Sequence, residues 1–412
     1  MLDLRDRFVV PPSPAVELRA FTHGLMPRTV PGMLARFAAD WAERGVDAWN
    51  EVENHWRPGS GERVGWWTLP AYLGDAFIAP MLGAGAGTCV MQPNVHHTVS
   101  YLLSAPEPFA DGRREVVFTG AEFPSVQHAV RQWAGLTGLV PRPIAPAFDG
   151  SLDADAVIDA ISDRTAWVFV SHVGFTSGEK VADAVLAAIG ERAHRHGAWF
   201  AVDGYHASGS VPVQVGALGC DVYFGGLLKE GCASAGNAYL YVRDGAALTP
   251  RLTGWFGDAD PFAFAPEPAP HPEVRRRFLA GTTAVAPLYH AVEGLRVLLE
   301  VGLENVRADA LAKTALAHTH ADRLGLAVRS PREDERRGVM VILEVPGADR
   351  VSEWLKTRGV YTDSRQGRYL RLAPFVYNTA EDVDRAFEAI EEGLAEGVQH
   401  HYTPPAVAGP VT

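Results

Sequence analysis

The stretch of sequence that decides the fold is Asp221-Val-Tyr-Phe-Gly-Gly-Leu-Leu-Lys229-Glu-Gly-Cys-Ala-Ser-Ala-Gly-Asn-Ala-Tyr-Leu-Tyr-Val242. A single lysine, Lys229, lies in it between two apolar runs that are typical of buried strands. An earlier apolar run, Ala198-Trp-Phe-Ala-Val-Asp203, ends in a carboxylate. The sequence therefore predicts a lysine and an aspartate at the ends of two successive buried strands.

This pair of residues indicates pyridoxal 5'-phosphate (PLP) chemistry. A buried lysine forms a Schiff base with the aldehyde of PLP, and an aspartate keeps the pyridine nitrogen protonated so that the ring accepts electrons from a carbanion. The alternative interpretation is that Lys229 extends to solvent from a strand end and that Asp203 caps a helix. Further motifs favour the first interpretation, with Lys229 and Asp203 as catalytic and cofactor-binding residues.

The composition excludes several classes of function. The chain has 412 residues, of which 47% are hydrophobic and 21% are charged, as in ordinary globular proteins. A net charge of −12 without any basic run argues against a nucleic-acid partner. The chain lacks a run of about 18 apolar residues and its first residues lack the apolar core of a signal peptide, so we expect a cytoplasmic protein that does not associate with membranes. No metal site is expected, because the cysteines lack metal-ligand spacing; they are Cys89, Cys220 and Cys232.

Strands and helices alternate through the middle of the chain, which predicts an α/β fold with a mostly parallel sheet covered by helices on both faces. We expect an N-terminal arm and helix over residues 1–60, a large PLP-binding domain over 61–287 and a small α+β C-terminal domain over 288–412. The strands expected in the large domain are Thr88–Met91, Glu115–Thr119, Ala166–Val170, Ala198–Val202, Val222–Phe224 and Ala238–Val242. Other expected segments are a helix over Pro70–Leu82, a surface loop over Asp258–Pro272, a long helix over Leu288–Leu299 and a disordered tail over Thr403–Thr412.

Five motifs occur along the chain in the order of one known family. They are Phe21-Thr-His23-Gly-Leu-Met-Pro-Arg28, Glu122-Phe123-Pro-Ser125, Asp203-Gly-Tyr-His206, Gly254-Trp255-Phe-Gly257 and Arg371-Leu-Ala-Pro-Phe-Val-Tyr377-Asn378-Thr379. Together they resemble the fold-type I PLP enzymes of the class V aminotransferase superfamily, in its kynureninase-like branch. The similarity extends from about Phe21 to Leu394. It implies PLP as the cofactor, a small amino-acid substrate, and a homodimer with active sites at the subunit interface.

The resemblance implies a role for each motif residue. Phe123 offers a flat face on which the pyridine ring can stack, unless it is an ordinary core phenylalanine. His206 is expected to bond Asp203 or to lie near the ring oxygen, and a satisfied core histidine is the alternative. The planar fork of Arg371 matches the α-carboxylate of a substrate, whereas a salt bridge is the alternative. His23, in the arm, is expected at the substrate, and Ser171 is expected to contact the cofactor.

The phosphate of the cofactor has a candidate site at a predicted helix N-terminus. The turn Gln92-Pro-Asn94-Val95-His96 follows a strand and opens a helix, so that its N–H groups can bind an anion. Asn94 and Val95 are the expected ligands. The resemblance also implies that Thr282, Thr283 and Trp255 reach the site from the second subunit, and these complete the set of cofactor-binding residues.

Three positions depart from the family. The residue before the lysine is a tyrosine that takes part in proton transfer in kynureninases, and here it is Leu228, which can neither donate a hydrogen bond nor move a proton. Asp258 replaces a histidine, and Gly174 replaces a residue that often makes a polar contact to the cofactor. These departures affect the reaction and leave the cofactor-binding residues intact.

The reaction expected first is therefore of the lyase type, on an L-α-amino acid with a modified side chain. It is either β-elimination from a cysteine S-conjugate or decarboxylation with oxidative deamination, as in the similar PLP enzymes of lincosamide antibiotic biosynthesis. The alternatives are kynureninase activity, then aminotransferase or epimerase activity, and finally a catalytically dead binding subunit with a PLP fold. The retention of Lys229, Asp203 and Arg371 argues against the last of these.

Overall fold

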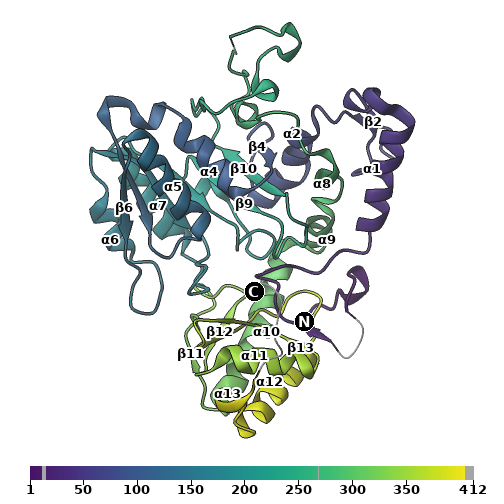
Figure 1. Ribbon diagram of the computed structural model, residues 1–412, viewed down its shortest axis with the longest axis vertical. Coiled ribbons are helices and arrows are strands. Elements are labelled where there is room, and N and C mark those ends of the chain that lie inside the picture. The colour runs from purple at the N-terminus through teal and green to yellow at the C-terminus, as the bar shows by residue number, and fades with distance from the viewer. Residues whose placement is uncertain (12–14, 268, 404–412) are drawn as a thin grey trace.

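The computed structural model describes residues 1–11, 15–267 and 269–403 and is built around a seven-stranded sheet (Figure 1). The strand order is β4-β10-β9-β8-β7-β5-β6. Only β10 is antiparallel to its neighbours, and the other pairings are parallel. The predicted α/β fold with a mostly parallel sheet is thus confirmed. The strands are β4 Cys89–Gln92, β5 Glu115–Thr119, β6 Val140–Ile144, β7 Thr165–Ser171, β8 Trp199–Asp203, β9 Val222–Gly226 and β10 Ala238–Val242.

Both faces of this sheet are covered, which explains the near-continuous apolar runs of its strands. Every residue of β5, β9 and β10 is buried. Along β7, Val168 and Val170 face one core, whereas Trp167 and Phe169 face the other. The helices α4 Val95–Ser104 and α5 Pro124–Thr137 pack on the second of these cores. The first is covered by α2 Leu69–Leu73, α3 Ala79–Leu82, α6 Ala154–Ala160, α7 Asp183–Arg195 and α8 Val285–His290.

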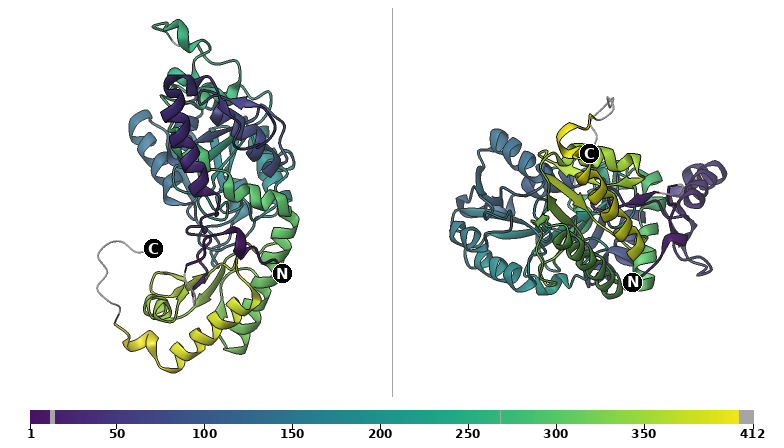
Figure 2. Two further views of the ribbon diagram at one scale, coloured as in Figure 1. Left: turned by 90° about the vertical axis from the view of Figure 1, so that its right-hand side faces the viewer. Right: turned by 90° about the horizontal axis from the view of Figure 1, so that it is seen from below.

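A smaller α+β unit follows, seen below the large sheet in Figure 1 and in the left view of Figure 2. Its four strands are antiparallel in the order β11-β12-β15-β14, and its helices bury a core of their own against them. The helix α9 Glu293–Val301 leads into it. Its elements are α10 Leu303–Arg323, β11 Ala327–Val328, β12 Val341–Glu344, α11 Ala348–Thr357, β13 Val360–Tyr361, β14 Asp363–Arg365, β15 Tyr369–Leu372, α12 Ala380–Ala395 and α13 Val398–His401. The boundaries at residues 60/61 and 287/288 remain predictions.

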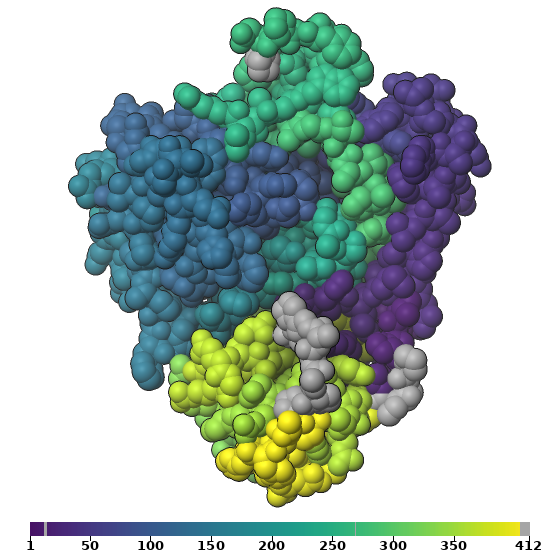
Figure 3. Space-filling view, viewed as in Figure 1, coloured from purple at the N-terminus to yellow at the C-terminus, as the bar shows by residue number. Residues whose placement is uncertain are grey.

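The N-terminal segment contacts both units. Its strand β1 Val16–Glu17 pairs in parallel with β13, and its helix α1 Val30–Arg44 lies against α8. A short hairpin, β2 Val52–Glu53 and β3 Arg63–Val64, follows α1. Figure 3 shows these N-terminal residues, in purple, along one side of the molecule down to the yellow-green C-terminal unit. The arm is thereby held close to the carboxyl ends of the central strands.

Several elements differ from the sequence-based expectations. The strand β6 was not predicted, because Pro141 and Pro143 interrupt its pattern; a strand with prolines is tolerated at this position because β6 is at the edge of the sheet. The single helix expected over Leu288–Leu299 is two helices, α8 and α9. Gly294, the second residue of α9, contacts the backbone of Gly231, where a Cβ would lie 2.3 Å from the carbonyl oxygen.

The remaining expectations concern irregular segments. The helix expected over Pro70–Leu82 is divided into α2 and α3 by a π-helical turn over Gly74–Ile78. The loop Asp258–Pro272 contains a 3-10 turn, Pro261–Ala263, and an isolated antiparallel bridge between Asp258 and Pro270. Apart from Thr403, the tail predicted to be disordered lies outside the described residues. Among the described residues, no helix is long and apolar enough to cross a membrane.

Gly24 tests how the arm is packed. A Cβ on Gly24 would lie 2.2 Å from the carbonyl oxygen of Lys229 and 2.7 Å from Sγ of Cys232, so Gly24→Ala must push the arm away from the lysine loop. We expect it to lower the free energy of unfolding by about 1–3 kcal/mol, measured by urea denaturation. Gly32→Ala is the matched control, since it adds a methyl group with nothing within 4 Å inside α1. A Gly24→Ala protein as stable as wild type would contradict the close packing of the arm.

Candidate active site

The carboxyl ends of five strands that run in the same direction supply one cavity. Parallel strands end at the same edge of a sheet, and the segments that follow them meet there. Asn94 follows β4, Phe123 follows β5, Ser171 ends β7, Asp203 ends β8 and Lys229 follows β9. These five residues line a cavity of about 340 Å3. The other lining residues are Val95, His96, Ser125, Val173, Phe175, Tyr205, His206 and Leu228.

Lys229 is the central cation of this cavity. Its Nζ lies 2.8 Å from Nε2 of His206. The same atom lies 4.7 Å from the ring centre of Tyr205 and 5.3 Å from that of Phe123. Burial lowers the pKa of Lys229, although the negative charges of Glu230 and Asp203 oppose the shift. The neutral, nucleophilic form of the amine is therefore more accessible than in an exposed lysine.

Asp203 is a buried carboxylate with one uncommitted oxygen. Its Oδ1 accepts the backbone N–H of Tyr205 at 2.8 Å, and no hydrogen bond to Oδ2 is present among the described residues. Burial raises the pKa of Asp203 to about 6. The histidine of the motif does not bond this carboxylate, because His206 contacts Lys229 instead. The uncommitted oxygen suits a cationic N–H donor such as a pyridinium.

The helix α4 begins at the cavity, as the sequence predicted. Asn94 is its N-cap, and its side-chain oxygen accepts the N–H of His97 at 2.9 Å. The N–H groups of Val95 and His96 precede the first intrahelical hydrogen bonds, and both residues line the cavity. A phosphate at this position would meet backbone donors and the positive end of the helix dipole.

Two aromatic side chains form the apolar wall of the cavity. Phe123 is 42% exposed, so one face of its ring is open to a flat ligand. Phe175 packs edge-to-face on Phe123, with ring centres 5.1 Å apart, and its ring is stacked 6.3 Å from that of His206. The predicted stacking position of Phe123 is thus compatible with the structure.

A buried acid not identified from the sequence adjoins this wall. Glu122 accepts the N–H of Ser171 at 2.9 Å and its hydroxyl at 2.5 Å. Burial and the charge of Asp203 raise the pKa of Glu122 to about 7. The hydroxyl of Ser171, expected to contact the cofactor, is therefore engaged with Glu122, although Ser171 does line the cavity.

The two expected substrate ligands lie at the edge of the site. Arg371 is buried and donates to Asp363 at 2.8 Å, and its guanidinium lies 5.6 Å from the ring centre of Phe175, which separates it from the cavity. Its Nε has no partner among the described residues. His23 is exposed and does not line the cavity, but the next residue, Gly24, donates its N–H to the carbonyl of Leu228 at 3.1 Å.

Three expected cofactor ligands lie away from the Lys229 of their own chain. Thr282 and Thr283 line a separate pocket of about 250 Å3. Trp255 is 41% exposed in an aromatic group with Trp67 and Phe262. The single chain therefore leaves these three residues outside the cavity.

The sequence also gave no reason to select Tyr205 or Glu230. Tyr205 lies inside a recognised motif, and its ring covers the amine of Lys229. Glu230 is completely buried, and neither of its carboxylate oxygens has a hydrogen-bond partner among the described residues. No local pattern in the sequence reveals that the acid next to Lys229 is itself buried.

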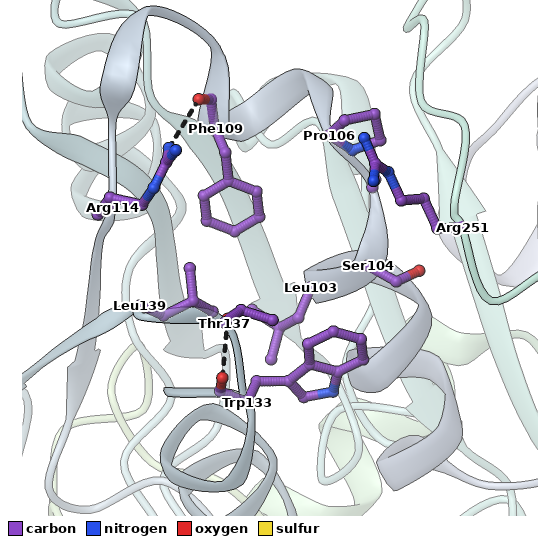
Figure 4. A pocket seen from close by; sticks show the side chains of 10 residues that line it. Leu103, Ser104, Pro106, Phe109, Arg114, Trp133, Thr137, Leu139 and Arg251 are labelled. Carbon is purple, nitrogen blue, oxygen red and sulfur yellow. Dashed lines mark hydrogen bonds between the residues drawn. The ribbon is translucent and has the colours of Figure 1, made fainter. Parts of the chain in front are cut away.

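A larger pocket, of about 450 Å3, lies elsewhere on the large unit (Figure 4). It is mainly apolar, with Leu103, Phe109 and Trp133 among its lining residues. The guanidinium of Arg114 at its rim already donates to the carbonyl of Phe109 at 3.0 Å. Neither a lysine nor a carboxylate lines this pocket, so the smaller cavity is the site suited to chemistry.

The cavity fits PLP on four structural grounds. It contains an amine for the aldehyde, an uncommitted carboxylate oxygen for the ring nitrogen, an open aromatic face for the ring and a helix N-terminus for the phosphate. Lys229, Asp203 and Phe123 would hold the ring end of PLP, and the turn at Asn94 and Val95 would hold its phosphate.

Comparison with known proteins agrees with this fit. The model of the class-V aminotransferase family matches residues 97–385. An uncharacterized aminotransferase, YcbU, from Bacillus subtilis is 31% identical over 76% of this chain and 81% of its own length. A kynureninase from Burkholderia pseudomallei is 28% identical over 95% of this chain and 92% of its own length.

Solved structures with the same fold include PLP enzymes. The apo cysteine desulfurase of Thermococcus onnurineus is similar with a TM-score of 0.76 at 20% identity, covering 93% of this chain and 95% of that one. The cystine C-S lyase C-DES, solved with cysteine persulfide, has a TM-score of 0.77 at 18% identity, covering 92% and 97%. The chain therefore belongs to the class-V aminotransferase family and is a PLP-dependent enzyme of fold type I.

Proposed function

We propose that this enzyme carries out a lyase-type reaction at Cα and Cβ of an L-α-amino acid with a modified side chain. The reaction is β-elimination from a cysteine S-conjugate or decarboxylation linked to oxidative deamination, in specialised metabolism such as antibiotic biosynthesis. The observation that carries the proposal is Leu228. It lines the cavity beside Lys229 and provides an apolar wall where proton transfer to a departing side chain would need a donor.

The side chains of this cavity support the proposal through their positions. PLP, when bound, withdraws electrons from Cα of the attached amino acid. Lys229 would hold the cofactor, and its amine, when free, would remove a proton from Cα. Asp203 would accept the ring N–H through its uncommitted oxygen and so maintain the positive charge of the ring. These tasks suffice for loss of a good leaving group from Cβ, without a further acid.

Arg371 supports recognition of an α-amino acid. Its Nη2 is committed to Asp363, which orients the guanidinium, and Nε remains for a second acceptor. The ion pair therefore positions Arg371 and does not occupy all of its donors. A carboxylate bound at Nε would lie next to Phe175, at the edge of the cavity.

Kynureninase activity is the second candidate function. It is favoured by the kynureninase relative that is aligned over 95% of this chain. Hydrolysis of kynurenine at Cγ needs an acid that Leu228 does not provide, so Glu122 or Tyr205 would have to replace it. Aminotransferase or epimerase activity remains a third candidate, since both begin with removal of the proton from Cα.

The proposal includes a homodimer in the cytoplasm. Trp255, Thr282 and Thr283 lie outside the cavity of their own chain, and a second subunit would bring its copies of them to the phosphate end of the site. The exposed aromatic side chains near Trp255 favour such a contact, since exposed apolar groups commonly mark interfaces.

Lys229→Ala should abolish covalent attachment of the cofactor while preserving the fold, because the amine is lost but the contacts to the ring and phosphate persist. Borohydride reduction followed by peptide mapping measures attachment, and circular dichroism measures folding. Lys180→Ala is a suitable control, since Lys180 pairs with Asp183 outside the cavity. A pyridoxyl group on a lysine other than Lys229 in wild type would refute the assignment.

Asp203→Asn should retain PLP and lower kcat/KM. The expected decrease corresponds to a loss of at least about 3 kcal/mol of transition-state stabilisation, because a neutral amide cannot stabilise the charged ring. The measurement compares cofactor content with turnover of the same preparation. Asp183→Asn removes a carboxylate outside the cavity and is the control. Activity within about tenfold of wild type would show that the ring nitrogen is paired with another group.

The reaction type is tested by incubating the enzyme with cysteine S-conjugates, other amino acids and L-kynurenine. Pyruvate with ammonia indicates β-elimination, carbon dioxide with ammonia and oxygen uptake indicates oxidative decarboxylation, and anthranilate indicates kynureninase. We expect negligible anthranilate, in wild type and in Leu228→Tyr, because restoring the tyrosine does not restore the family histidine that Asp258 replaces. Anthranilate release at about 1 per second or faster under saturating kynurenine would establish the second candidate instead.

A further inference from the structure

Glu230 is a buried acid with no evident structural task. Its side chain is completely inaccessible to solvent, and both carboxylate oxygens lack a hydrogen-bond partner among the described residues. A buried, unpaired carboxylate is costly to stability, so such groups are uncommon away from functional sites. Glu230 follows Lys229 directly in the chain, but unlike Lys229 it does not line the cavity.

His206 lies close to both residues, at hydrogen-bond distance from Lys229 and slightly beyond that distance from Glu230. Its Nε2 lies 2.8 Å from Nζ of Lys229, and its Nδ1 lies 3.6 Å from Oε1 of Glu230. Burial and the charge of Lys229 lower the pKa of His206 well below its usual value, so the imidazole is neutral. A neutral imidazole has one N–H and one lone pair, and it can therefore accept a proton on one side and release one on the other.

We propose that Lys229, His206 and Glu230 form an internal proton relay. The ammonium of Lys229 gives a proton to Nε2 of His206 while the N–H at Nδ1 gives its proton to Oε1 of Glu230. The lysine becomes a neutral amine, the glutamate becomes a neutral acid, and the imidazole changes tautomer. The number of protons in the site stays constant, and no exchange with solvent is needed. The inference rests on the proposed role of Lys229 as the cofactor lysine.

The surroundings of the site make the proton affinities of the Lys229 amine and the Glu230 carboxylate similar. Burial raises the pKa of Glu230 and lowers the pKa of Lys229, so the two values approach each other from opposite sides. Low polarity also disfavours a separated ion pair relative to the two neutral groups. The other charged or titratable groups that act on the two residues are Asp203, Tyr205, Cys232, Arg365, Arg371 and Tyr377.

The relay would serve the step in which the amine must be neutral. An ammonium cannot attack the aldehyde of the cofactor or accept a proton from a substrate. Leu228, on the cavity side of the lysine, provides no group to take the proton. Glu230 takes it on the opposite side, away from the substrate, and the relay is thus independent of the reaction at Cβ.

The test is the pH dependence with which PLP attaches covalently to the full-length, cofactor-free protein, followed by visible absorbance. The pH of the measurement is varied between the ordinary pKa values of glutamic acid and lysine, about 4.3 and about 10.4. In wild type the relay supplies neutral amine internally, so we expect an attachment rate that changes little between the two titration steps of the pair. In Glu230→Gln the proton must leave to solvent, and the rate should rise about tenfold per pH unit up to a single midpoint.

Two further variants separate a relay from a structural role. Glu230→Asp keeps a carboxyl group, so its attachment rate should again be independent of pH over part of the range in which the wild-type rate changes little. Glu293→Gln removes another buried carboxylate that adjoins the same loop but is paired with Arg296 at 3.0 Å, and it should keep the wild-type profile. Rates are compared as ratios to wild type at each pH, which cancels the titration of PLP itself.

The outcomes distinguish a failure of the relay from a failure of the assignment of Lys229 as the cofactor lysine. A wild-type profile in Glu230→Gln, with the pyridoxyl group mapped to Lys229, would refute the relay and leave the cofactor lysine in place. Labelling of another lysine would refute the proposed role of Lys229. If Glu230→Gln fails to fold, infrared spectra of wild type decide: a carboxylic-acid band should persist above pH 7, where Glu122, with a pKa of about 7, is ionised. Its absence would also refute the relay.

Discussion

Parallel pairing of β8 with β9 is the constraint on which the active site depends. Asp203, the last residue of β8, is paired with Phe224 of β9, and both strands end at the same edge of the sheet. The chain that leaves β9 must therefore pass Asp203, and Lys229 lies on that path. A slip of one residue in this pairing would turn the side chain of Asp203 to the other face and separate the carboxylate from the cavity.

The second property of the site is the burial of several acids and bases within one region. Desolvation raises the pKa values of Glu122, Asp203 and Glu230, whereas it lowers those of Lys229 and Arg371. The acids differ in their partners. Glu122 is held by Ser171, Asp203 by a single backbone N–H, and Glu230 by no group among the described residues. Such an arrangement keeps protons mobile near neutral pH, as PLP chemistry requires.

Much of the large sheet could be predicted because its strands are buried on both faces and therefore appear as apolar runs. The strand β6 was not predicted because prolines interrupt its pattern, and the two-residue strands β11 and β13 are too short to show a period. Lys229, Asp203, Phe123 and the turn at Asn94 could be selected because each follows a predicted strand. Glu122 and Glu230 could not, because an acid beside a motif residue has no pattern that reveals its burial.

The sequence by itself determined the family, the cofactor and the residues at the strand ends, because these depend on short motifs and on local patterns of polarity. The tertiary structure decided which groups meet. It paired Arg371 with Asp363, set Ser171 against Glu122 and turned His206 from Asp203 to Lys229. It also left Trp255, Thr282 and Thr283 outside the cavity of their own chain. Contacts of this kind join residues far apart in the chain, and their geometry follows from packing and desolvation, which no local pattern encodes.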